Sequence, residues 1–355
     1  MSMLALTTTA IAWLIAAVIA GGWIVYAILN ARSARSELGS EIELAANRKA
    51  YYDDEELEGP RLERMQVLGV ALLALIVVGL PLYWIFEPSR QAGAEERQAE
   101  LAVKWGAALF ASTEDGGFNC AGCHGGMNAV GGVAPFNISD PITGEVTAVN
   151  WQSPALNSIY YRYDFDEVRF ILVYGRPFSP MSPWGLDGGG PMNTQQIDNL
   201  LAYMESIQIP RENCGPGEDN PRLCASGHLP SDIQDDIDTL ARQGVADGDY
   251  ESYGEALFNL DLAAGAYSCA RCHTQGWSWG DPQVPGLGAF GWNLTGGAAN
   301  SHFSSQEELT EFISRGSELG ARYGIQGQGS GRMPGYGSTL TDEQLTAVVE
   351  YIRTL

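Results

Sequence analysis

The sequence has little positive charge. Its 355 residues include 20 lysines and arginines against 43 aspartates and glutamates, which gives a formal net charge of −23 at pH 7. A protein that neutralises phosphates needs the opposite balance, so this composition excludes nucleic-acid binding. An acidic surface would instead steer a basic partner, at rates that fall as salt rises, or simply keep an external domain soluble.

The chain also lacks the common groupings of catalytic residues. Histidine is limited to four residues, and we find no serine–histidine pair, no phosphate-binding loop and no nucleotide site. The chain is therefore not expected to be a catalyst by itself.

Cysteine is limited to six residues, and four of them stand in two copies of Cys-x-x-Cys-His. The copies are Cys120-Ala121-Gly122-Cys123-His124 and Cys269-Ala270-Arg271-Cys272-His273. This pattern attaches haem c, because both thiols form thioethers to the macrocycle and the adjacent histidine ligates the iron. Disulfides, a zinc site or a redox dithiol are the alternatives, but none of them calls for a histidine after each pair. We predict two covalently bound haem c groups.

The surroundings of the two copies repeat as well. The segments 105–110 and 253–258 both read aromatic-Gly-x-Ala-Leu-Phe, which predicts a helix with one apolar face before each motif. Pro135 and Pro285 follow the motif histidines in glycine-rich loops. Such a loop can present a backbone carbonyl to the second ring nitrogen of the histidine and so orient it. The repeat predicts two homologous modules.

A methionine is the expected second axial ligand in each module, because His/Met ligation is common in electron transfer and raises the potential. Met333 precedes a predicted helix over 340–355. In the first module Met181 and Met192 compete, and Met181 shares with Met333 an aromatic residue at +3 and a glycine at +4. We therefore predict Met181 and Met333 as ligands and Met192 as a core residue. His302 competes with Met333 for the second iron, but its Ser/Asn-flanked loop favours a surface or capping position. His228, beside Pro230 in a polar linker, is expected to be solvated.

This arrangement resembles the class I cytochromes c, over roughly 100–207 and 250–355. The resemblance implies a small helical fold in each module, in which the helix before the motif packs on the helix around Tyr203 or Tyr351. The expected fold class is all-α, with two tandem class I cytochrome c modules preceded by two transmembrane helices.

The N-terminal part differs in kind. Ala10–Leu29 and Val67–Phe86 each contain no charge and are long enough to cross a bilayer of about 30 Å. No charge precedes Arg32, which argues against a cleaved signal peptide. The segment 30–66 holds six lysines and arginines, which favours a cytoplasmic loop. Haem c is attached outside the cytoplasm, so we expect a multi-pass protein of the cell membrane with its haem modules on the outer face.

These observations divide the chain into a membrane anchor and haem modules separated by a linker: 1–90, 91–207, 208–248 and 249–355. The linker contains one predicted helix, from Ser231 to Arg242. Its cysteines, Cys214 and Cys224, are expected to form a disulfide outside the cytoplasm. A metal site with His228 is the weaker alternative, because only three ligands are in view.

The haem organisation is similar to that of dihaem subunits of bc-type and cbb-type respiratory complexes. This resemblance implies electron transfer between a quinol-oxidising bc-type complex and a haem–copper terminal oxidase, with a mobile electron carrier as a further partner. One alternative is an electron acceptor for a periplasmic dehydrogenase. A dihaem peroxidase is another, but it needs an open distal position, which two methionine loops disfavour.

Overall fold

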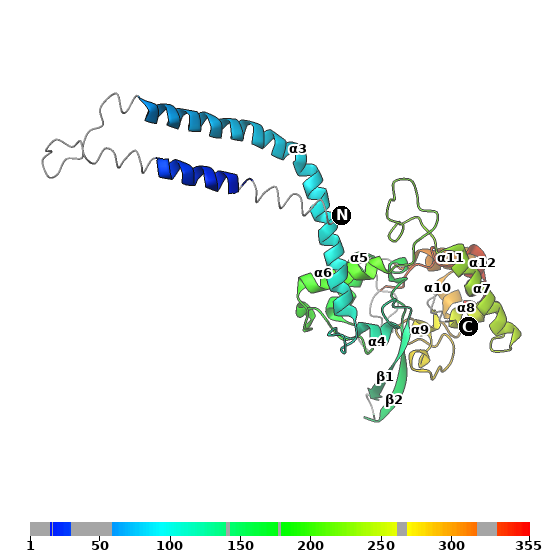
Figure 1. Cartoon of the computed structure of the whole chain (residues 1–355). Coiled ribbons are helices and arrows are strands. Elements are labelled where there is room, and N and C mark those ends of the chain that lie inside the picture. Colours follow the sequence, from blue (N-terminus) through cyan, green and yellow to red (C-terminus); the bar gives the residue numbers. More distant parts are fainter. Residues whose placement is uncertain are drawn as a thin grey trace. The chain divides into compact units, whose positions relative to one another are not determined.

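The chain forms two compact units, Met1–Ser89 and Arg90–Leu355, in the computed structural model (Figure 1). The structure describes residues 15, 17–29, 59–139, 143–176, 179–260, 268–317 and 332–355. The long helix α3 (Pro60–Phe110) contributes residues to both units.

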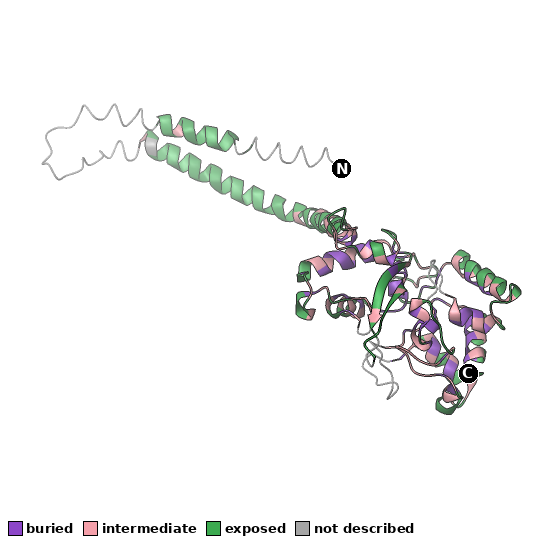
Figure 2. Ribbon diagram, turned by 90° about the horizontal axis from the view of Figure 1, so that it is seen from below, coloured by how far each residue is buried: buried purple, intermediate pink, exposed green. Residues whose placement is uncertain are grey.

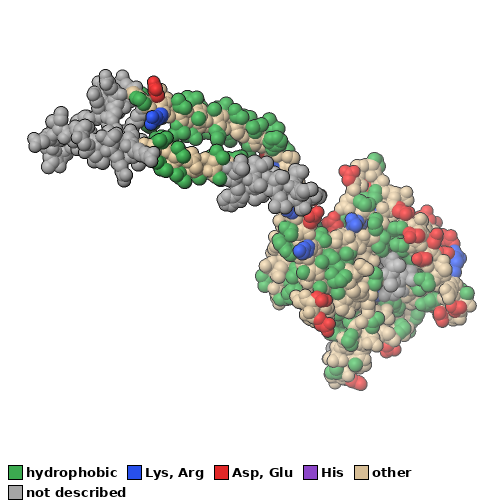
Figure 3. Space-filling model, viewed as in Figure 1, with side chains coloured by type: hydrophobic (Ala, Val, Ile, Leu, Met, Phe, Trp, Pro, Cys, Tyr) green, Lys and Arg blue, Asp and Glu red, His purple; other side chains and the backbone are tan. Residues whose placement is uncertain are grey.

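The part of α3 in the first unit is exposed throughout 62–86, and its residues 67–86 carry no charge and are almost all apolar (Figures 2 and 3). A helix of this length and hydropathy can cross a membrane, and among the described residues it is the only one that passes this test. The expectation of two membrane helices is therefore corrected to one. Among the described residues, the other apolar helix, Ala17–Leu29, is shorter than this test requires. Residues 10–14 of the expected first span, and 30–58 of the expected cytoplasmic loop, lie outside the described residues.

The prediction of an all-α fold is wrong. The structure is 54% helical, and the second unit contains an antiparallel hairpin of β1 (Gly132–Ser139) and β2 (Val146–Ser153). The hairpin occupies the stretch after the first motif that was expected to be a glycine-rich loop. Alternating β-branched and aromatic residues favour this pairing, which places Phe136 opposite Val149. The fold is therefore not the expected pair of purely helical class I modules.

The helices of the second unit are short and separated by loops. After α3 they follow in chain order: α4 (Cys120–His124), α5 (Phe165–Tyr174), α6 (Thr194–Ser206), α7 (Ser231–Ala246), α8 (Tyr253–Asn259), α9 (Ala270–His273), α10 (Ala298–His302), α11 (Gln306–Arg315) and α12 (Asp342–Ile352).

Two hydrophobic cores lie in the second unit. The first includes Phe110 of α3 with Leu200 and Leu201 of α6. The second includes Phe258 of α8 and Val348 of α12, together with residues of α7 and α11. Figure 2 shows buried residues, in purple, on helices throughout the second unit.

The same helix contact is built in both cores. A Cβ at Gly106 of α3 would lie 1.9 Å from the carbonyl oxygen of Asn199, and one at Gly254 of α8 would lie 2.1 Å from that of Ala347. Each glycine therefore lets two helix backbones touch where a side chain would separate them. The ring centroids of the final phenylalanine and the partner tyrosine are 5.2 Å apart in the first core and 5.4 Å apart in the second: Phe110–Tyr203 and Phe258–Tyr351. The repeated aromatic-Gly-x-Ala-Leu-Phe strings are explained by this contact.

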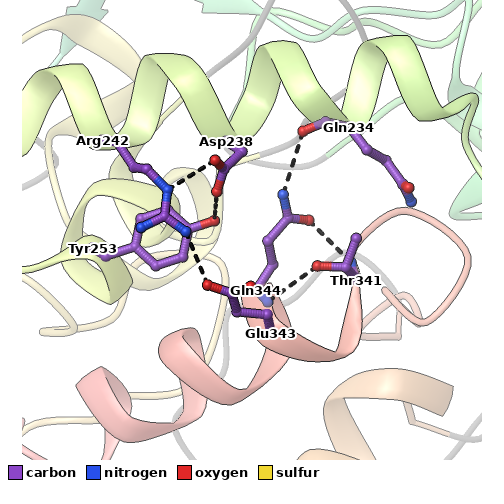
Figure 4. A network of polar contacts seen from close by, with 7 residues as sticks. All are labelled: Gln234, Asp238, Arg242, Tyr253, Thr341, Glu343 and Gln344. Carbon is purple, nitrogen blue, oxygen red and sulfur yellow. Dashed lines mark hydrogen bonds and ion pairs between the residues drawn. The ribbon is translucent and has the colours of Figure 1, made fainter.

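The connecting segment is fastened to the second core. The expected helix from Ser231 is present as α7, extends to Ala246, and buries Ile237 and Ala241 in that core. Its Asp238 carboxylate accepts hydrogen bonds from Arg242 Nε at 2.8 Å and from the Tyr253 hydroxyl of α8 at 2.5 Å (Figure 4). The predicted disulfide between Cys214 and Cys224 is confirmed.

Replacing Asp238 by asparagine is expected to lower the free energy of unfolding by about 1 kcal/mol at pH 7. The Arg242 and Tyr253 hydrogen bonds hold the pKa of this carboxyl below its ordinary value. The stability that it contributes is therefore present at neutral pH and is lost as the pH falls through the lowered pKa. Urea unfolding should show the difference from wild type shrinking below about pH 4. Asp236→Asn, exposed on the same helix, should change stability little at either pH, and an equal loss there would contradict the assignment.

Candidate functional site

Each Cys-x-x-Cys-His motif forms about one helical turn. In site 1 (Cys120, Cys123 and His124) the turn is α4, and Gly125 ends it with φ 86°. In site 2 (Cys269, Cys272 and His273) the turn is α9 with the cysteine before it. Positions i, i+3 and i+4 share one face of a helix, so both sulfurs and the imidazole point the same way. None of these four cysteines is in a disulfide.

Both motif histidines are oriented by a backbone carbonyl. Nδ1 of His124 lies 2.9 Å from the carbonyl oxygen of Pro154, and Nδ1 of His273 lies 2.8 Å from that of Trp292. Withdrawal from water is the main cause that lowers the pKa of both imidazoles, which keeps them neutral. With the proton on Nδ1 donated to the carbonyl, Nε2 presents its lone pair to a metal.

The expected backbone carbonyl is present in both copies, in different settings. Trp292 lies in the loop after the second motif, whereas Pro154 directly follows strand β2. The loops begin alike, because Gly131 and Gly288 donate their N–H to the carbonyl of the motif histidine, at 2.8 Å in both cases. Trp292 follows Gly288 after a few residues, whereas the β1–β2 hairpin intervenes before Pro154. A hairpin inserted in one copy thus shifts the acceptor along the sequence while preserving its place in the fold.

Site 2 is closely packed around its imidazole. A Cβ at Gly291 would lie 2.7 Å from Cε1 of His273, and the Gly291 N–H donates to the Cys272 carbonyl at 2.7 Å. The ring therefore rests directly on the loop backbone, which limits its rotation. Burial raises the pKa of the Cys269 thiol to about 12, and that of the Cys120 thiol in site 1 to about 11. These thiols are protonated at neutral pH.

The structure separates the two candidate methionines of the first module. Met181 borders the cavity that contains site 1, whereas Met192 is fully buried in the first core. The Met181 carbonyl accepts the N–H of Arg176 at 2.8 Å, as the Met333 carbonyl accepts that of Ser317 at 3.0 Å. The donors follow glycines that end α5 and α11 with positive φ: Gly175 and Gly316.

A serine hydroxyl accepts the N–H of each methionine, but from different positions. Ser179 lies two residues before Met181, whereas Ser317 follows the helix-ending Gly316. The Met181 N–H donates to Ser179 Oγ at 3.2 Å, and the Met333 N–H donates to Ser317 Oγ at 2.9 Å. By their carbonyl contacts Met181 and Met333 occupy equivalent turns, a likeness that Met192 does not share. Their role as iron ligands stays a prediction.

The cavity of site 1 is mostly apolar, with a few polar groups. Its walls include Phe110, Leu200 and Met204 of the first core, next to both motif cysteines and His124. Apolar walls with few polar groups suit a flat, hydrophobic macrocycle. The residues of site 1 therefore fit a haem c, with Met181 on the cavity wall available to the iron.

Met333 is anchored to the first half of the unit by its neighbour. Arg332 donates from Nε and Nη2 to the two carboxylate oxygens of Glu167 in α5, at 2.6 and 2.9 Å. Met333 itself packs against the second core. His302 is exposed beside Trp292, with ring centroids 5.5 Å apart, and His228 is exposed. Both histidines lie where the sequence suggested.

Sequence reasoning missed several residues that shape site 1. They line the cavity from segments far apart in the chain: Trp151, Arg162, Arg176 and Arg271. Arg162 is buried and donates to Ser158 Oγ at 3.0 Å and to the Ala155 carbonyl at 2.9 Å. The one signal in the sequence was Arg271, which stands in the second motif where the first has Gly122.

The comparison with known families concerns site 2. Residues 262–352 match the family model described as cytochrome c oxidase, cbb3-type, subunit III. The match supports a cytochrome c domain. It includes the three residues of site 2 and Met333, whereas site 1 lies outside it. A cytochrome c domain implies covalently bound haem c and indicates electron transfer. Neither a curated protein nor a solved structure matches the chain.

Proposed function

We propose that this chain is a membrane-anchored cytochrome with two haem c groups that transfers electrons within a respiratory chain. One observation carries the count of two. Site 1, outside the family match, has the same construction as site 2. Each has two cysteines in no disulfide, a histidine whose Nδ1 is bonded to a carbonyl, and a methionine whose carbonyl accepts the N–H of the residue after a helix-ending glycine.

The roles follow from this construction. Cys120 and Cys123, like Cys269 and Cys272, would attach a macrocycle. His124 and His273 would be the proximal ligands, and Met181 and Met333 the distal ones. Haem c, when bound, supplies a one-electron couple. The chain holds each imidazole in one orientation and surrounds site 1 with apolar side chains, which exclude water and so influence the potential.

The domain organisation follows as part of the proposal. Residues 91–207 and 249–355 would each carry a haem, with 208–248 joining them. The apolar part of α3 would anchor the chain in the membrane. The haem-bearing unit would lie on the outer face, because haem c is attached there.

The proposed partners are respiratory complexes. The family matched by residues 262–352 is a subunit of a cbb3-type oxidase, which favours a place between a quinol-oxidising bc-type complex and a haem–copper oxidase. On the face of the second unit seen in Figure 3, acidic side chains outnumber basic ones. Such a surface would attract a basic mobile carrier.

The test is purification of the full chain from native membranes in mild detergent, with haem quantification and identification of the bound subunits. Two covalent haems per chain, together with subunits of a bc-type complex or a haem–copper oxidase, are the expected result. One haem per chain would contradict the second site. Co-purification with a substrate-oxidising dehydrogenase would favour that alternative, and rapid peroxide turnover would favour a peroxidase.

A further inference from the structure

Arg271 extends from the second motif into the surroundings of the first. It lies between Cys269 and Cys272, yet its side chain borders the cavity of site 1. It is only 4% exposed, its Nη1 donates to the Gln152 carbonyl of β2, and its guanidinium lies 5.0 Å from the ring centroid of Trp277. The hydrogen bond and the ring contact fix the position of the charge.

Aromatic rings from both halves of the second unit meet beside the site 1 cavity. Trp151 of β2 borders the site 1 cavity, and its ring centroid lies 5.8 Å from that of Trp279 and 6.4 Å from that of Phe290. Cys272 of site 2 also lines this cavity. The hairpin thus brings the second motif against the cavity of the first site.

The charge of Arg271 acts in a setting that water screens poorly. Arginine keeps its proton under all ordinary conditions, so the charge is permanent. Arg271 is buried and borders the cavity that also contains Cys120, Cys123 and His124. The guanidinium therefore places a permanent positive charge beside site 1 from its place in the other motif.

We propose that Arg271 belongs to site 2 by sequence but serves site 1 by its charge, which raises the reduction potential of the haem held there. Reduction adds one electron to the iron, and a fixed positive charge nearby favours the form that carries the extra negative charge. The inference rests on the proposed function, because it requires a haem at site 1. It makes the site 1 potential depend on the residue inside the second motif.

The experiment is a spectroscopic redox titration of the detergent-solubilised full chain. The transitions are first assigned with Met181→His and Met333→His. Arg271→Gln should then make reduction at site 1 about tenfold less favourable, which is about 59 mV for one electron, with a smaller change at site 2. Arg271→Lys should keep most of the wild-type potential. Arg211→Gln is the matched control: this arginine stacks on Tyr161, 4.4 Å from its ring centroid, and does not line the cavity.

The outcomes separate the inference from the proposed function. The inference is supported if Arg271→Gln lowers the reduction potential of the site 1 haem, Arg271→Lys keeps it near the wild-type value, and Arg211→Gln leaves it unchanged. No shift at site 1, an equal or larger shift at site 2, or the same shift in the lysine variant overturns it while two haems remain attached. Wild-type protein without a haem at site 1 overturns the proposed function itself. Haem staining after denaturing electrophoresis of single-motif variants makes that distinction.

Discussion

Met333→His is expected to lower the reduction potential of the haem at site 2, on the order of 0.1 V, while the haem stays covalently attached. A thioether ligand favours ferrous iron more than an imidazole does, and the attachment depends only on Cys269 and Cys272. The turn that presents Met333 is held by Ser317 and Arg332 through its backbone and its neighbour, so the exchange leaves that turn in place.

A redox titration followed by visible absorption measures this effect, and denaturing electrophoresis with haem staining checks the attachment. Met127→His provides the control, because it adds a histidine at a side chain that is 41% exposed. An unchanged potential in Met333→His would remove Met333 from the ligand set. His302, exposed on α10, would then be the next residue to replace.

Met181→Ala and Met192→Ala are expected to affect different properties of the protein: iron ligation in the first case and stability in the second. Loss of Met181 should lower the potential of the site 1 haem and remove the spectral signature of iron–thioether bonding. Loss of Met192, whose side chain is fully buried in the first core, should leave that spectrum intact and destabilise the protein by about 2–5 kcal/mol, because it leaves a cavity.

Each variant serves as the control for the other. Potential and absorption report on ligation, while urea unfolding reports on packing. If Met192→Ala abolished the iron–thioether signal and Met181→Ala did not, the ligand would be Met192, and the equivalence of the Met181 and Met333 turns would have no functional meaning.

The groups expected to bind haem could be predicted from the amino-acid sequence alone. A Cys-x-x-Cys-His motif places its three groups on one face because of helix geometry, whatever the rest of the fold. The choice of Met181 over Met192 came from the aromatic residue and glycine that follow it, and Met181 indeed borders the site 1 cavity. The repeated glycine string likewise marked the point where two helices touch.

Other features depend on contacts between distant segments. The glycine-rich composition after the first motif predicted a loop, but this segment forms a hairpin because β1 and β2 pair with each other. The apolar sequence before Arg32 favoured a second membrane span, whereas among the described residues only α3 passes the test for one. The hairpin does not follow from local preference, because strand pairing depends on which backbone groups meet in the fold.

In the two sites, too, some features follow from the sequence and others only from the tertiary structure. The sequence identified the groups that would bind haem, since thiol and imidazole chemistry is carried by residue type. Only the tertiary structure showed that Pro154 and Trp292 orient the histidines and that Arg271 borders the site 1 cavity. A carbonyl is present in every residue, and a charge acts through space rather than along the chain, so their roles are assigned by folding.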